Sequence, residues 1–223
     1  MALTKFNYNS FDLTTAASKG LAFNSSANGF ETSSSGSRTL IKTLTASSSA
    51  NLTFVHGSSS VVLDNTYPVY MFKFINWHPA TDNVWIRMEP SINGGSNYNA
   101  VNSTSSHFRA YHDEGDSATS LGYYGDGDLA ESTDGQILCT EVGNGNDNSA
   151  CGTLFLFNPS STTFVKHYIS TFQVVYNASA GYSMNNYVGG YINTTSAVNA
   201  IKFRFNSGNI DAGTIKLYGI KDS

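Results

Sequence analysis

One stretch of the sequence carries acidic side chains without basic ones. No Lys or Arg lies between Ala110 and Val165, whereas nine of the sixteen Asp and Glu residues do. Crowded carboxylates repel one another, and a hard cation such as Ca²⁺ with several oxygen ligands relieves that repulsion. Asp126 and Asp128, in YYGDGDLAES, form the best candidate pair for Ca²⁺. The alternative is a solvated acidic loop, because DGD turns also form for backbone reasons alone.

The other residue types that could do chemistry form no recognisable catalytic pattern. The sequence has no G-x-S-x-G, H-E-x-x-H or phosphate-binding G-x-x-x-x-G-K-[ST] motif. A glycosidase needs two carboxylates in different environments, and here the acids share one polar region. The five histidines have no metal-ligand spacing; His107 and His167 fall in strand patterns, where a solvent-facing or hydrogen-bonded histidine is the ordinary case. We therefore expect no enzymatic activity.

Aromatic residues form the second group of candidate contact residues. Tyr and Trp rings offer a flat apolar face with a polar tip, which suits sugar binding or a protein interface. Those not readily assigned to a core face are Trp77, Trp85, Tyr123, Tyr124, Tyr182, Tyr187 and Tyr191. Tyr123, Tyr124 and Tyr182 are the candidate glycan-binding residues, provided that loops gather them at one end of the fold. Each residue taken singly could equally belong to the packing.

The amino-acid composition indicates the class of fold that positions these residues. Among 223 residues, 13% are charged and 13% aromatic, against a background rich in Ser, Thr, Asn and Gly. This composition is typical of a β-protein. The net charge of −4 provides no basic surface for nucleic acid or for an anionic membrane.

The N-terminal sequence and the two cysteines indicate the cellular compartment. The first twenty residues contain no signal-peptide-like apolar run, and no stretch approaches the ~20 apolar residues of a spanning helix, so we expect synthesis without Sec export. Cys139 and Cys151 bracket a short loop that a disulfide could close. In a reducing cytosol we expect two free thiols instead.

After residue 38, apolar and polar residues alternate with the period of half-buried strands. The predicted strands are 39–45, 51–55, 67–77, 83–89, 106–111, 136–142, 152–158, 163–177, 186–193, 199–205 and 213–219. Many strands and long connections between 112 and 135 favour a jelly-roll-like antiparallel β-sandwich over residues 39–223. Immunoglobulin-like and galactose-binding-like sandwiches remain alternatives, because the period alone does not separate them.

Two strands show which side chains should face the core. In NVWIRME the predicted inward residues are Val84, Ile86 and Met88, opposite Trp85, Arg87 and Glu89. In NAIKFRF the inward residues are Ile201, Phe203 and Phe205, opposite Lys202 and Arg204. One-sided burial is therefore expected.

Residues 1–38 are predicted to form an extended N-terminal arm. The segment is rich in small polar residues but keeps spaced apolar ones, which a disordered tail would lack. These are Leu3, Phe6, Tyr8, Phe11, Leu13, Leu21, Phe23 and Phe30. We expect an arm that docks on another surface; the alternative is a first pair of strands of the same domain.

The segment from Thr153 to Ile220 resembles the β-sandwich domain at the C-terminal end of many small virion structural proteins of tailed bacteriophages. The resemblance is carried by TLFLFNPSSTTFVKHYISTF and by NYVGGYINTTSAVNAIKFRFNSGNIDAGTIKLYGI. Upstream, YPVYMFKFINWHPATDNVWIRMEPSINGGSNYNA is similar to the earlier strands of that domain, so the resemblance spans residues 67–220. Within SGNIDAG, Gly208 and Gly213 are expected to need positive φ in a tight turn. The acidic region 112–150 departs from the typical pattern.

The resemblance implies a non-enzymatic virion component, displayed outside the particle, assembled in the host cytoplasm and forming a homotrimer. It also implies major capsid or tail proteins as partners. GLAFNSSANGFETSSSGS is similar to segments that precede fibre or decoration modules. We expect capsid decoration, with an arm anchored to the virion by Leu3, Phe6, Tyr8, Phe11 and Leu13. The alternative is a tail fibre or receptor-binding knob that binds a host surface glycan.

Overall fold

The computed structural model describes residues 20–23, 26, 28–33, 37–176 and 181–221. Every regular element in this part is a β-strand, which confirms the all-β prediction, and none of the described segments is a helix able to cross a membrane. The strands are β1 (Gly20–Phe23), β2 (Phe30–Ser33), β3 (Arg38–Thr45), β4 (Leu52–Val55), β5 (Val69–Pro79), β6 (Val84–Ser91), β7 (Ser103–Asp113), β8 (Thr119–Tyr123), β9 (Leu129–Ser132), β10 (Gln136–Val142), β11 (Ala150–Phe157), β12 (Lys166–Tyr176), β13 (Tyr182–Ile192), β14 (Ala200–Phe205) and β15 (Ile210–Ile220).

The chain divides into two compact units, residues 1–37 and 38–223. In the first unit, β1 and β2 pair with each other as an antiparallel hairpin, and the rings of Phe23 and Phe30 stack with centroids 4.9 Å apart. The hairpin forms a sheet of its own, so these described strands are not part of the sandwich sheet. The five expected anchoring residues lie outside the described part of the chain: Leu3, Phe6, Tyr8, Phe11 and Leu13.

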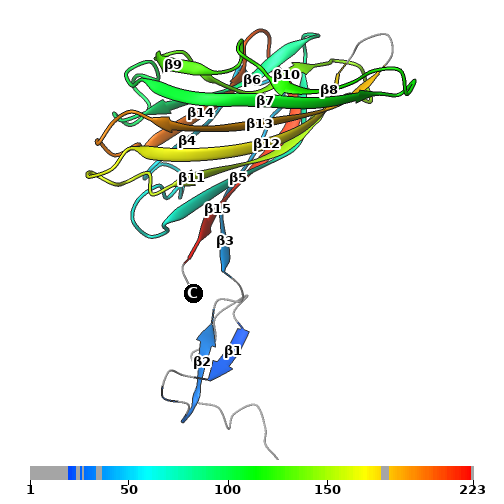
Figure 1. Ribbon diagram of the computed structural model, residues 1–223. Coiled ribbons are helices and arrows are strands. Elements are labelled where there is room, and N and C mark those ends of the chain that lie inside the picture. The colour runs from blue at the N-terminus through cyan, green and yellow to red at the C-terminus, as the bar shows by residue number, and fades with distance from the viewer. Residues whose placement is uncertain (1–19, 24–25, 27, 34–36, 177–180, 222–223) are drawn as a thin grey trace, which may run out of the picture. The chain divides into compact units, whose positions relative to one another are not determined.

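The second unit is an antiparallel, jelly-roll-like sandwich (Figure 1). One layer has the strand order β3-β15-β5-β11-β12-β13-β7, and both β8 and β9 pair with the far edge of β7. The other layer has the order β10-β6-β14-β4. Val142 of β10 pairs with Tyr176 of β12, so the sheet folds over at this point and nearly closes into a barrel.

Aromatic rings from both layers meet in the core. Phe72 and Phe74 of β5 lie 5.1 and 4.9 Å from Phe203 of β14, measured between ring centroids. Phe54 of β4 lies 5.3 Å from Phe72. All four rings are buried, and each such side chain contributes about 1.5 to 3 kcal/mol to folding relative to an exposed one. These contacts hold the two layers together.

All eleven predicted strands are present in the structure. The region 112–135 was expected to be a long connection, and that expectation is wrong, because it contains the short strands β8 and β9. Both pair with β7 at the edge of the layer. Every residue of β8 is exposed, so no apolar alternation marked this strand in the sequence.

The predicted inward faces of β6 and β14 are confirmed, since all six inward residues are buried. Two other residues are more buried than expected. Glu89 lies on the polar side of β6 as expected, opposite Lys202, but it is buried: it is 3% exposed and forms ion pairs with Lys202 and Arg204 on the neighbouring strand β14. Trp77 was left without a core assignment, but it is fully buried and its ring lies 6.0 Å from that of Phe205.

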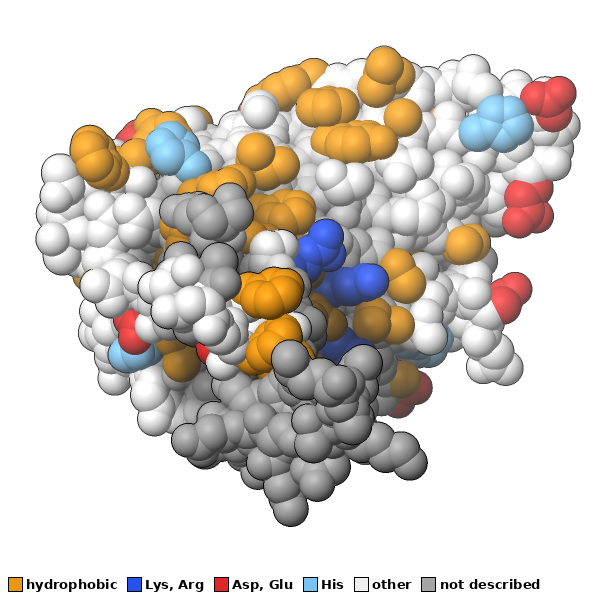
Figure 2. Space-filling view, turned by 90° about the horizontal axis from the view of Figure 1, so that it is seen from below, with side chains coloured by type: hydrophobic (Ala, Val, Ile, Leu, Met, Phe, Trp, Pro, Cys, Tyr) orange, Lys and Arg blue, Asp and Glu red, His pale blue; other side chains and the backbone are white. Residues whose placement is uncertain are grey.

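The outer face of the larger layer keeps several apolar side chains in solvent. Leu40, Phe108, Leu121 and Ile169 are exposed there, and Phe108 stacks on Tyr187 with centroids 5.0 Å apart. In Figure 2 hydrophobic side chains form several groups on the surface seen from below. The sandwich therefore has apolar surface that its own core does not use.

Candidate functional site

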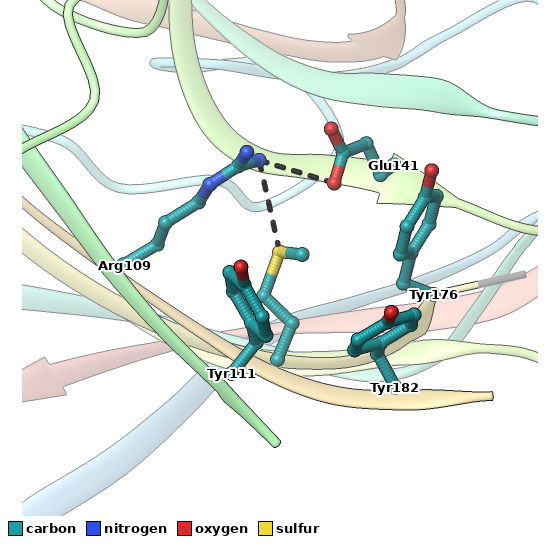
Figure 3. Close-up of a pocket in the computed structure, with 6 residues that line it drawn as sticks. Arg109, Tyr111, Glu141, Tyr176 and Tyr182 are labelled. Carbon is teal, nitrogen blue, oxygen red and sulfur yellow. Dashed lines mark hydrogen bonds and ion pairs between the residues drawn. The ribbon is translucent and has the colours of Figure 1, made fainter. Parts of the chain in front are cut away.

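A cleft lies between β7, β10, β12 and β13. Alternate side chains of β7 point inward, and β10 is the last strand of the layer that faces them. His107 is therefore buried, whereas Arg109 and Tyr111, further along β7, are only half-buried. The cleft has a volume of about 260 Å³ (Figure 3). Its lining residues are Arg109, Tyr111, Glu141, Tyr176, Tyr182 and Met184.

An ion pair lies on one side of the cleft. Arg109 Nη1 is 3.0 Å from Glu141 Oε2 and donates a hydrogen bond of 3.2 Å to Thr140 Oγ1. The guanidinium carbon lies 3.9 Å from the ring centroid of Tyr124, in a cation–π contact. The side chains of Arg109 and Glu141 are 21% and 19% exposed, so this ion pair is fixed but still reachable from solvent.

The backbone of β10 directs Glu141 into the cleft. The register between β10 and β6 shifts between Cys139 and Val142, and such bulges re-aim side chains. Glu141 has a φ of 60°, in the left-handed region that residues other than glycine rarely adopt. Backbone strain of this kind is concentrated at functional sites.

Three tyrosines form the opposite side of the cleft. The rings of Tyr111 and Tyr182 meet edge to face with centroids 5.4 Å apart, and those of Tyr176 and Tyr182 are 5.7 Å apart. Within the described part of the chain, none of their three hydroxyl groups has a hydrogen-bond partner. The hydroxyl groups point toward the side where Arg109 and Glu141 lie (Figure 3). They are available to a ligand.

A second cavity, of about 230 Å³, shares Arg109 and Tyr111 with the first. Tyr123 and Tyr124 line it, together with Ser120 and Gly122. The structure thus places Tyr182 in the first cavity and Tyr124 against Arg109 in the second. Tyr123 pairs with Phe108 and is 64% exposed, so it lies at the rim of the second cavity on the outer face. These three predicted glycan-binding residues were expected on loops, but Tyr182 begins β13 and Tyr123 ends β8.

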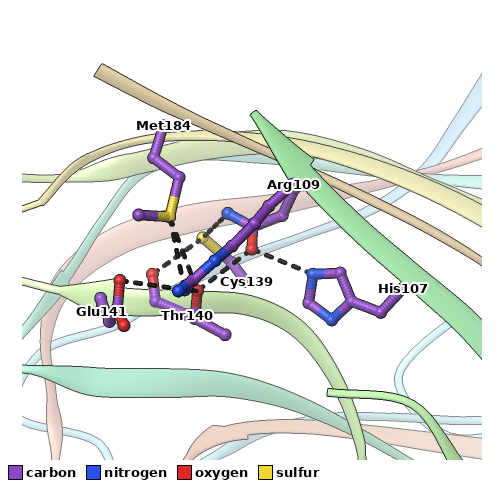
Figure 4. A network of polar contacts seen from close by, with 7 residues as sticks. His107, Arg109, Cys139, Thr140, Glu141 and Met184 are labelled. Atoms are coloured by element: carbon purple, nitrogen blue, oxygen red, sulfur yellow. Dashed lines mark hydrogen bonds and ion pairs between the residues drawn. The ribbon is translucent and has the colours of Figure 1, made fainter. Parts of the chain in front are cut away.

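A buried polar network supports the floor of the cleft (Figure 4). Thr140 Oγ1 donates to Asn186 Oδ1 at 3.2 Å, and His107 Nε2 lies 3.1 Å from the same oxygen. Burial lowers the pKa of His107, which is the hydrogen-bonded strand histidine that was expected. Burial raises the pKa of the Cys139 thiol, which disfavours the thiolate form. Cys139 and Cys151 are both free, as predicted.

The structure adds no third His, Cys, Asp or Glu ligand from the described residues to Asp126 and Asp128, the pair proposed for Ca²⁺. No group of three or more His, Cys, Asp and Glu side chains that could hold a metal ion exists among the residues that the structure describes. Asp128 accepts a hydrogen bond from the hydroxyl group of Tyr123. The Ca²⁺ site at Asp126 and Asp128 therefore stays a prediction.

Several residues of the cleft were not identified from the sequence. Arg109 and Tyr111 share the alternation of SHFRAY with His107, and this period could have placed them on one face. Glu141 could not have been distinguished from the other acids, because a bulge and a partner on β7 define its place. Tyr176 and Met184 had no distinguishing pattern.

Comparison with known proteins identifies no relative. No protein-family model matches the chain, and neither a curated protein nor a solved structure shows significant similarity to it. The geometry of the cleft is therefore the structural basis for inferring function, and membership of a phage virion stays an expectation from the sequence.

Proposed function

We propose that this protein is a non-enzymatic surface protein of a bacteriophage virion and that its sandwich binds a host surface glycan in the cleft. The observation that carries this proposal is the set of three tyrosines, Tyr111, Tyr176 and Tyr182, with unpaired hydroxyl groups opposite the Arg109–Glu141 ion pair. The sequence alone favoured capsid decoration, with a tail-fibre or receptor-binding role as the alternative. Because of the cleft, we now prefer the receptor-binding role.

The chemistry of the cleft suits a sugar ring. Tyrosine rings supply apolar faces on which the C–H groups of a sugar can pack, and their hydroxyl groups can bond to sugar hydroxyls. Arg109 and Glu141 add a charged donor and a charged acceptor at fixed positions. An apolar pocket with a few convergent polar groups is the usual form of a small-ligand site.

Capsid decoration is the second candidate function. What favours it is the N-terminal unit, a separate hairpin on which Leu21 and Phe23 are exposed. Attachment through residues 1–37 serves either function, so the number of copies per particle discriminates between them. Hundreds of copies indicate decoration of the capsid, and a few to a few dozen indicate the tail.

Homotrimer formation belongs to the same proposal, as does contact with the major capsid or tail proteins. The exposed apolar residues Leu40 and Ile169 on the outer face of the larger layer support it, because a partner would remove them from water. Light scattering on purified protein tests the trimer; a mass of one chain would contradict it.

The binding of purified, labelled protein to host cells tests the glycan-binding function. Tyr111→Ala and Tyr182→Ala should each weaken binding about tenfold, because an aromatic contact contributes about 0.5 to 1.5 kcal/mol beyond its buried area. Tyr191→Ala is the matched control, since Tyr191 lies on the outer face of β13, the strand that also carries Tyr182. The proposal would be contradicted if Tyr111→Ala and Tyr182→Ala bound the cells as strongly as Tyr191→Ala does.

A further inference from the structure

Arg109, the only positively charged residue among the described residues that line the cleft, is already neutralised. Glu141 Oε2 lies 3.0 Å from Arg109 Nη1, and one face of the guanidinium is covered by the ring of Tyr124. Nη1 is also bonded to Thr140. An incoming carboxylate or phosphate could still bond to other N–H groups of the guanidinium, but it would meet an arginine whose charge Glu141 already balances, so its net electrostatic gain would be small.

Further acidic groups lie near the tyrosines of the two cavities. Burial raises the pKa of Tyr124. The positive charge of Arg109 lowers this pKa, whereas the negative charges of Glu141 and Asp126 raise it further. Asp128 is hydrogen-bonded to Tyr123 at the second cavity. Asp113 and Glu114 line a further cavity that shares Tyr182 with the cleft. The field at the cleft is thus unfavourable to an anion.

The length of the site exceeds one sugar ring. The two cavities, of about 260 and 230 Å³, both use Arg109 and Tyr111, so they are adjacent compartments of one groove. Each compartment has its own tyrosines, Tyr176 and Tyr182 in one and Tyr124, with Tyr123 at the rim, in the other. A ligand with a ring in each compartment would contact all of these residues.

We infer that the groove binds an uncharged oligosaccharide of at least two sugar units and discriminates against glycans that carry uronic or sialic acid. This inference rests on the proposed glycan-binding function and specifies the ligand of that site. Discrimination arises because Arg109 is neutralised by Glu141 while the neighbouring carboxylates repel a negative ligand.

A microbial glycan array with neutral, uronic-acid, sialylated and amino-sugar oligosaccharides provides the first test. The purified full-length protein should bind neutral members with two or more sugar rings. For the best neutral member, raising the salt from 50 to 500 mM should change the dissociation constant less than about twofold, because no ion pair with the ligand is screened. Preferential binding of acidic oligosaccharides would overturn the inference while leaving glycan binding intact. Absence of binding to any carbohydrate would overturn both.

Glu141→Gln provides the second test, since it removes the charge that neutralises Arg109. The ratio of the variant's affinity for a uronic-acid trisaccharide to its affinity for the matched neutral trisaccharide should rise about tenfold over the wild-type ratio, whatever the loss of the Glu141 acceptor does to both affinities. Asp211→Asn is the control, because it makes the same change of net charge on β15, at the other end of the larger layer. Circular dichroism establishes that both variants fold. An unchanged ratio of the two affinities in Glu141→Gln would overturn the proposed role of the ion pair.

Discussion

Glu89 shows how one side chain can depart from the alternation of its strand. It is 3% exposed, and its carboxylate lies 2.5 Å from Lys202 Nζ and 2.6 Å from Arg204 Nη2. A Cβ atom on Gly135 would lie 2.8 Å from Glu89 Cγ, so a glycine at this position leaves room for the carboxylate. Burial acts to raise the pKa of Glu89, but hydrogen bonds from Lys202 and Arg204 and their charges lower it below its ordinary value of 4.5.

Glu89→Gln should lower the free energy of unfolding at pH 7 by about 2 to 4 kcal/mol, because it leaves two partly buried cations without their counter-charge. A carboxyl group whose pKa is lowered by folding stabilises the protein above its unfolded-state pKa, and this contribution is lost as the pH falls through the folded-state value. The difference between wild type and variant should therefore shrink from pH 7 to pH 3 in urea titrations. An equal loss at both values would show that packing, and not charge, is responsible.

At the scale of the element, β15 depends on glycine backbone freedom. The positive φ predicted for Gly208 and Gly213 is confirmed, with angles of 69° and 123°. Gly213 lies where the register between β15 and β5 shifts. A Cβ atom there would lie 2.6 Å from the carbonyl oxygen of Asn76 and 2.9 Å from Trp77 Cα. These are backbone atoms of the paired strand, so neither can move away without disturbing the sheet.

Gly213→Ala should therefore lower the free energy of unfolding by about 2 to 3 kcal/mol, since it combines an unfavourable φ with a steric clash. Gly189→Ala in β13 is the matched control, because a Cβ atom at Gly189 would meet nothing within 4 Å. This control should change stability by less than about 0.5 kcal/mol. Denaturation of both variants in urea measures the two effects, and comparable losses would refute the explanation.

At the scale of the whole molecule, the buried hydrophobic cluster of the described residues lies in the second unit. The buried cluster extends from Ala46 to Leu217, whereas the described residues of the first unit include exposed apolar side chains such as Leu21 and Phe23. The proposed attachment segment and the core that stabilises the sandwich thus belong to different units of the chain. Changes in residues 1–37 should affect attachment without unfolding the sandwich.

Replacement of Phe6 and Phe11 by Ser should release the protein from virions, because apolar side chains that would bind the particle are lost. The thermal unfolding midpoint of the sandwich should stay within about 2 °C of the wild-type value, since the core is untouched. Phe108→Ser, on the surface of the sandwich, is the control and should remain attached. Quantitative mass spectrometry of purified particles measures attachment. Retention of the double variant at wild-type levels would contradict the anchoring role.

The period of two in the sequence determined eleven strands and the inward faces of β6 and β14, because side-chain direction along a strand is a local property of the backbone. The residue types also led to Tyr123, Tyr124 and Tyr182 as candidate glycan-binding residues. Only the tertiary structure decided that Glu89 is buried and that Arg109 meets Glu141. It also paired β8 and β9 with β7. These outcomes depend on which strands become neighbours and where a bulge turns a side chain, and long-range pairing of this kind is not encoded in any single stretch of sequence.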